Sequence, residues 1–297
     1  MSRMVGRIAV LILSLQAIAG ECQADEGTPA QQYAAILKAY RPVSGGMRTA
    51  TTDLQRKTAV EGLAAFSSKF VDLAEKFPGD PIALKALQQA VQVVGSTDSA
   101  ALNAWEMNRS DFPAGNRDGS AGRTVALVLR DHVLSDKLGP VVDRMRYAYR
   151  MDYEKCLRTV LEKNPHRNVQ ALTCLALAQF LNDKLRTNRL AEDRPELATG
   201  CEIVFGKQYL PNLQQLGRAE LSKRIEALFE RAIDEYADVK FRAGTVGETA
   251  KSELYAIRHL SVGSVAPDIQ GQDQDGEQFQ LSHYRGKVVL LYFWSEF

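Results

Sequence analysis

The fold class of this chain is indicated by the segment Leu221-Ser222-Lys223-Arg224-Ile225-Glu226-Ala227-Leu228-Phe229-Glu230-Arg231-Ala232-Ile233-Asp234-Glu235-Tyr236. Its apolar side chains recur at intervals of three and four residues, which places them along one face of an α-helix. It is the clearest such stripe in the sequence. It predicts a helix that packs through one side against other helices.

Signals for the ends of helices lie on both sides of this stretch. Phe77-Pro78-Gly79 ends one apolar stripe, and Asp80-Pro81 provides the cap and first position of the next helix. Asn164-Pro165 repeats this arrangement. Thr245 and Glu248 form a capping box for a last helix. These segments predict antiparallel helical hairpins packed into a bundle or short solenoid, without a period typical of a named repeat family.

The expected fold is a mainly α-helical bundle or solenoid-like domain over residues 25–260. Two segments within it, 41–52 and 108–123, are rich in turn-forming residues and are expected to be a connection and a long loop. After His259 the period changes from helical to strand-like. We therefore expect a domain boundary at residues 261–266 and a second unit over residues 261–297.

Val288 to Phe293 is an unbroken apolar run near the end of the sequence. Such a run is typical of a strand that is covered on both faces inside a parallel sheet. A parallel neighbour is reached through a crossover of about a dozen residues or more. The sequence therefore predicts a domain that is incomplete within this chain.

The residues that lead into this run resemble a known family. The motifs are Val262-Gly263-Ser264-Val265-Ala266-Pro267-Asp268, Asp273-Gln274-Asp275-Gly276-Glu277-Gln278-Phe279-Gln280-Leu281-Ser282-His283-Tyr284-Arg285-Gly286-Lys287 and Phe293-Trp294. In order and spacing they resemble the opening of TlpA-like or AhpC/TSA (redoxin) domains, of the thioredoxin-fold superfamily. The resemblance implies the first β-hairpin and strand of an incomplete thioredoxin-like α/β domain.

The same resemblance implies a function and a site. The family contains thiol-disulfide oxidoreductases and peroxiredoxins, which serve antioxidant defence and redox homeostasis and act on thiol or disulfide proteins or on peroxide. Its first catalytic cysteine, in a C-x-x-C motif, would follow Phe297 directly, so we expect no catalytic residue within this chain and no activity from it. Pro267, Trp294 and Phe297 would support that site. A selenocysteine codon, a nonsense mutation and a fragment remain open as reasons for the end at Phe297.

A second resemblance concerns the helical region. Residues 161–172, 205–209 and 236–240 look like segments of the helical extension that precedes the redoxin domain in planctomycete-type TlpA-like proteins. That extension brings no residue roles to this chain. The alternative function is therefore a helical protein-binding or scaffolding module without chemistry.

The amino terminus resembles a secretory signal peptide over residues 1–24. Arg3 and Arg7 precede an apolar run, residues 8–19, that is too short to span a bilayer comfortably. Cleavage would leave a periplasmic or secreted protein without a transmembrane span. Cys22 offers a lipoprotein alternative, but Glu21 before it is not the small residue that lipid attachment requires.

Composition and motifs exclude several other functions. Lys and Arg total 37 against 36 Asp and Glu, a balance that gives no footprint for nucleic acid. No phosphate-binding glycine motif or nucleophile elbow occurs, and no cofactor is expected. The histidines lack metal-ligand spacing and are expected at the surface or at caps: His132, His166, His259 and His283. Residues 273–276 fit an Asp-Gly hairpin turn better than a calcium loop.

Three cysteines follow the signal peptide, and no two of them form a C-x-x-C motif. Cys174 lies among leucines on a predicted helix, where a buried thiol is expected. Cys156 and Cys201 could form a disulfide in an oxidising compartment, and the sequence leaves the pairing open.

Overall fold

The structure is a computed structural model that describes residues 27–292, apart from 107–117, 149, 216, 262 and 274. Four predictions lie outside the described residues. These are the signal peptide over residues 1–24, the lipoprotein alternative at Cys22, and the site-supporting roles of Trp294 and Phe297.

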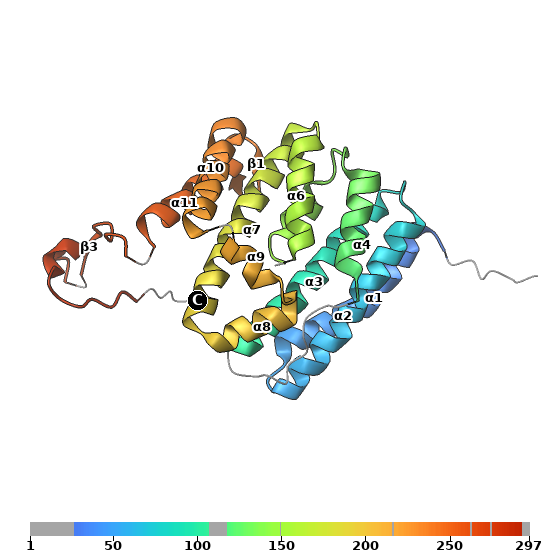
Figure 1. Ribbon diagram of the computed structural model, residues 1–297, viewed down its shortest axis with the longest axis horizontal. Helices are drawn as coiled ribbons and strands as arrows, with labels where there is room; N and C mark the ends of the chain where they lie inside the picture. The colour runs from blue at the N-terminus through green and yellow to red at the C-terminus, as the bar shows by residue number, and fades with distance from the viewer. Residues whose placement is uncertain are drawn as a thin grey trace, which may run out of the picture.

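The described chain is mostly helical, with two short hairpins near its carboxyl end, as the sequence predicts for the fold class (Figure 1). The helices are α1 (Pro29–Thr49), α2 (Asp53–Lys76), α3 (Ile82–Glu106), α4 (Ser120–Leu127), α5 (Gly139–Met145), α6 (Met151–Lys163), α7 (Arg167–Asp193), α8 (Pro195–Phe205), α9 (Tyr209–Gln215), α10 (Arg218–Tyr236) and α11 (Val246–His259). A π-helical turn, η1 (Val128–His132), continues α4. The hairpins are β1 (Lys240–Phe241) with β2 (Gly244–Thr245), and β3 (Gln270–Gln272) with β4 (Gln278–Gln280), followed by a 3-10 turn, η2 (Leu281–Tyr284).

Helices pack side by side both with neighbours along the chain and with more distant ones, and α1 and α11 lie at opposite ends of the helical body (Figure 1). The most extensive pairings are α1 with α2, α2 with α3, α7 with α10, and α10 with α11. The apolar stripe over residues 221–236 is the face of α10 that packs on α7. Leu221, Ile225, Phe229, Ala232 and Tyr236 of this face are buried. The predicted arrangement of stacked helical pairs is confirmed.

Capping fixes where several helices begin. Thr245 and Glu248 form the predicted capping box, in which each side chain accepts a hydrogen bond from the backbone N–H of the other. The Asp80 carboxylate accepts from the Ile82 N–H at 2.8 Å, and α3 begins at Ile82, one residue after the predicted first position at Pro81. Asn164 makes contacts beyond the helix cap that the sequence predicts. It accepts from the His166 N–H and donates to the carbonyls of Val133 and Ser135, which ties the turn after η1 to the start of α7.

The prediction of a connection over residues 41–52 is wrong, because α1 continues through Pro42 to Thr49 and only residues 50–52 connect it to α2. Proline removes one helical hydrogen bond. Packing against α2 outweighs this loss. Tyr40 is buried and its ring meets Phe66 and Phe70 edge-on, at centroid separations of 5.7 and 6.0 Å.

The prediction of a long loop over residues 108–123 is wrong at its carboxyl end, since α4 begins at Ser120. Asp118 explains the start of this helix. Its carboxylate accepts from the Ser120 N–H at 2.9 Å and from the hydroxyls of Ser67 and Ser68 on α2. Residues 107–117 lie outside the described part of the chain.

The predicted hairpin in the last segment is confirmed by β3 and β4, which pair antiparallel with Gly271 opposite Phe279. The predicted buried strand is wrong over residues 288–292. These residues are not in a strand, and Val288 and Leu290 are almost fully exposed. The physical reason is that no strand in the described part of the chain lies beside them to accept their backbone hydrogen bonds.

Candidate functional site

The segment with the redoxin resemblance is organised around one carboxylate. Asp268 accepts hydrogen bonds from the backbone N–H and the hydroxyl of Ser282, both at 2.8 Å. These two hydrogen bonds lower the pKa of the exposed Asp268 carboxyl. The Leu281 N–H donates to the Ile269 carbonyl at 2.9 Å. Together the contacts fasten η2 against the chain that enters β3.

A tight turn joins the two strands of this segment. The Asp273 carboxylate accepts from the N–H groups of Asp275 and Glu277, both at 2.9 Å. Gly276 has a φ of +83°, which favours glycine. The predicted Asp-Gly hairpin turn is confirmed. Within the described ranges, no three His, Cys, Asp or Glu side chains come together as metal ligands would.

This segment contributes the hairpin and the turn after it, but no thiol. Residues 263–292 contain no cysteine. Pro267, the described member of the three predicted supporting residues, is half-buried at the entry to the hairpin. Its role beside a catalytic sulfur stays a prediction.

The three described cysteines are buried and free, so the disulfide considered between Cys156 and Cys201 does not form. Cys156 belongs to the main core around α6 and α7, whereas Cys201 of α8 lies in a separate cluster with Leu197 and Tyr209. Cys174 is buried on α7 as predicted, and its thiol donates to the Leu228 carbonyl. Burial raises the pKa of each thiol to about 12, which leaves almost none of it as nucleophilic thiolate.

The histidines are surface or capping residues in three of four cases, as predicted. His166 is the exposed N-cap residue of α7, and His259 and His283 are also exposed. His132 corrects the prediction, because it lies in η1 and is 8% exposed. Burial lowers the pKa of its imidazole. No local residue pattern indicates this burial, because the π-helical turn that buries His132 depends on packing around α4.

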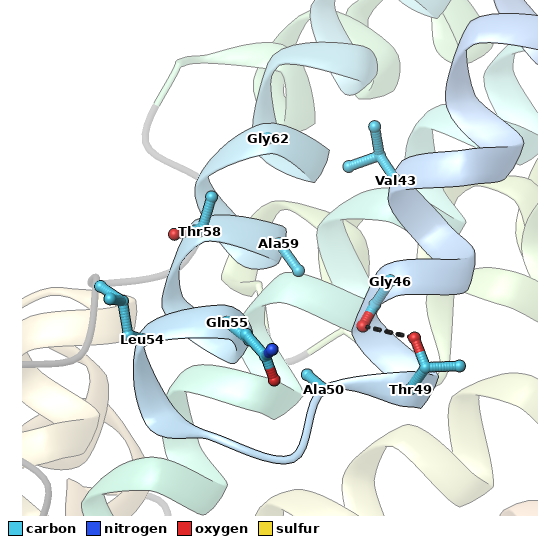
Figure 2. A pocket seen from close by; sticks show the side chains of 9 residues that line it. All are labelled: Val43, Gly46, Thr49, Ala50, Leu54, Gln55, Thr58, Ala59 and Gly62. Atoms are coloured by element: carbon cyan, nitrogen blue, oxygen red, sulfur yellow. Dashed lines mark hydrogen bonds between the residues drawn. The ribbon is translucent and has the colours of Figure 1, made fainter.

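A groove of about 630 Å³ separates the carboxyl half of α1 from the amino half of α2. Figure 2 shows Val43 and Gly46 of α1 facing Ala59 and Gly62 of α2, with Leu54 at the outer edge. None of the lining side chains is titratable. The groove can therefore accept an apolar surface but supplies no acid, base or nucleophile.

A smaller cavity, of about 330 Å³, is polar and was not predicted. It lies where the turn after α5, the middle of α7, the β1–β2 turn and α11 meet. Its charged side chains are Arg146, Asp183, Arg242 and Glu253. They are spread over more than one hundred residues of sequence and form no motif, so only the tertiary structure reveals them.

The comparison with known families agrees with the sequence resemblance in the last segment. A model of the AhpC/TSA family matches residues 262–297. Neither the curated proteins nor the solved structures include a significant match to this chain. Within the described ranges, no helix has both the length and the apolar character needed to cross a membrane. The family resemblance therefore rests on the segment that holds β3, β4 and η2.

Proposed function

We propose that this chain belongs to an exported thiol-disulfide oxidoreductase or peroxiredoxin-like protein, in which residues 25–260 form a helical extension and residues 261–297 open the redoxin domain. The AhpC/TSA match to residues 262–297 is the observation that carries this proposal. The export signal is residues 1–24, and the working compartment is periplasmic or extracellular. The partners are a thiol or disulfide protein, or peroxide.

The reactive group is a cysteine or selenocysteine that follows Phe297, with a resolving cysteine three residues later. A thiolate attacks one sulfur of the substrate disulfide and releases the other sulfur as a thiolate, giving a mixed disulfide. The resolving thiolate then displaces the bound sulfur, so the substrate is reduced and the pair is oxidised. A position at a helix amino terminus lowers the pKa of the first thiol through the exposed N–H groups and the helix dipole.

The exposed apolar run supports this proposal. Val288, Leu290 and Tyr292 are more than four-fifths exposed. Covering a large apolar side chain stabilises a protein by about 1.5–3 kcal/mol. These side chains would gain that burial as a strand inside a completed thioredoxin-like sheet, where both faces are covered.

The test is to read the transcript beyond codon 297 and to express its product. We expect an open frame that encodes cysteine, or selenocysteine at UGA, followed by x-x-C. We also expect the purified product to reduce insulin disulfides or to consume peroxide. The matched control replaces that first cysteine or selenocysteine by serine and loses turnover. A different codon context, or a product without turnover, contradicts the proposal.

A second candidate function is a binding module without chemistry. One observation favours it: every buried hydrophobic residue of the described ranges lies between Tyr40 and Leu254, so the helical part holds its core without the redoxin-like segment. Expression of residues 25–260 separates the two candidates. A stable domain that binds a partner, together with an extended product that shows no turnover, would favour this second function.

A further inference from the structure

The polar cavity of about 330 Å³ is built around a buried arginine. Arg146 is 7% exposed, and its guanidinium donates hydrogen bonds to the Gln179 side-chain carbonyl and to the Tyr147 hydroxyl. Its Nε lies 3.4 Å from the Asp143 carboxylate. A charged group is buried in this way only where it is paired and hydrogen-bonded. Arg146 is therefore a fixed part of the cavity wall.

Two chains of hydrogen bonds begin at Arg146. One ends at the negative charge of Glu253, and the other ends at the positive charge of Arg242. On one side the Gln179 amide N–H donates to Glu253 at 3.0 Å. On the other side Arg242 donates to the Tyr147 hydroxyl at 2.7 Å. The cavity thus has an acidic end at Glu253 and a basic end at Arg242. The Tyr147 hydroxyl accepts from both guanidiniums, and its own proton is available to a ligand oxygen.

The basic end is held by a strained backbone. Arg242 has a φ of +53° and, among the described residues other than glycine, it alone has a positive φ. It occupies the turn between β1 and β2, a position where glycine is favoured. Strain of this kind is concentrated at functional sites. An arginine at this position makes the turn less stable than a glycine would, and its guanidinium lies at the cavity.

The acidic end holds a carboxylate without a partner. Asp183 lies one turn after Gln179 on the same face of α7 and is half-buried. Within the described part of the chain it makes no side-chain hydrogen bond and no ion pair. Burial raises the pKa of the Asp183 carboxyl, and the nearby charge of Glu253 adds to this, although the charges of Arg186 and Arg146 oppose it in part. A cationic ligand group would supply the partner that Asp183 lacks.

We propose that this cavity binds a small zwitterion of the α-amino acid class, with its carboxylate at Arg242 and Tyr147 and its ammonium at Asp183 and Glu253. A simple anion would meet two carboxylates at the acidic end, and a simple cation would meet two guanidiniums. A ligand with both charges satisfies both ends. The cavity opens to solvent beside Tyr147, which is 42% exposed, so the ligand can enter without unfolding the helices.

The test titrates the 297-residue protein with each of the twenty L-amino acids in turn, by calorimetry and by thermal unfolding at about 10 mM ligand. We expect at least one amino acid to bind and to raise the melting temperature. Its N-acetyl derivative and its methyl ester each lack one charge, and we expect each to bind about tenfold or more weakly.

Two variants test the two ends of the cavity. R242G removes the guanidinium while it relieves the left-handed backbone, so the protein should fold at least as well and bind about tenfold or more weakly. D183N should show a similar loss. The matched controls are A243G in the same turn and D234N on the exposed face of α10, both with parental affinity. Absence of binding by all twenty amino acids, equal binding of the blocked derivatives, or parental affinity in R242G or D183N would overturn the proposal.

Discussion

Among single residues, Lys184 of α7 and Glu154 of α6 form a buried ion pair that joins the two helices. Lys184 is almost completely buried, and its ammonium lies 2.6 Å from the Glu154 carboxylate. Arg158 donates to the same carboxylate at 2.9 Å. Burial alone would raise the pKa of Glu154, but the charges and hydrogen bonds of Lys184 and Arg158 together outweigh burial and lower it. The ion pair therefore joins α6 to α7, and each buried charge is stabilised by the other.

Removing one partner should destabilise the protein strongly. K184M leaves the Glu154 carboxylate buried with a single, more exposed partner, and we expect a loss of about 3–5 kcal/mol in the free energy of unfolding. The double variant E154Q/K184M removes both charges and should recover most of that loss. Urea unfolding of the three proteins checks this, and equal stability of K184M and the parent would contradict it.

The same pair predicts how stability depends on acid. A carboxyl whose pKa is lower in the folded state than its ordinary value of 4.5 stabilises the fold above that value, and the contribution is lost as pH falls through the lowered pKa. Between about pH 6 and about pH 3, the parent should lose more stability than E154Q/K184M. Urea midpoints across this range measure the difference. A parallel decline in the two proteins would contradict the assignment.

At the scale of elements, the sequence predicted helix starts well and one helix end poorly. The signals for helix starts are local. Thr245 and Glu248 form a capping box at the start of α11, and Asp80 caps the start of α3. The carboxyl half of α1 is different, because Pro42 and two glycines favour a break locally. Packing of this half against α2 outweighs that preference, and such packing cannot be read from nearby residues.

Pro42 therefore offers a direct test of this balance. It is exposed within α1, so P42A restores a backbone N–H to the helix without changing the core. We expect an increase of about 1–3 kcal/mol in the free energy of unfolding. Thermal and urea unfolding measure it. Unchanged or lower stability would show that the proline is compatible with α1.

Across the whole molecule, the sequence predicts the redoxin-like segment but does not predict the polar cavity. The redoxin-like segment has its motifs in a continuous stretch, and the hairpin turn at Gly276 was predicted from them. The polar cavity is lined by Arg146 from the turn after α5, Asp183 from α7 and Glu253 from α11, and no spacing along the chain connects them. Sequence reasoning finds local chemistry and misses sites that are assembled by packing.

The distribution of the core predicts the effect of truncation. The last buried hydrophobic residue of the described ranges is Leu254, whereas Val288 to Tyr292 are exposed. A protein that ends at residue 260 should keep its cooperative helical unfolding and associate less than the 297-residue protein. Light scattering at matched concentrations and circular dichroism measure both properties. Greater association of the shorter protein would contradict the exposure of this run.

We propose that the helical body supplies no redox-active thiol and that thiol-disulfide chemistry requires the cysteine or selenocysteine proposed after Phe297. The most direct measurement is insulin reduction by the purified, folded protein of residues 25–297, which excludes Cys22, with dithiothreitol as reductant. We predict no turnover above the dithiothreitol background, because Cys156, Cys174 and Cys201 are buried with pKa values raised to about 12. Catalytic turnover that is lost when any of these three cysteines is replaced by serine would contradict the account.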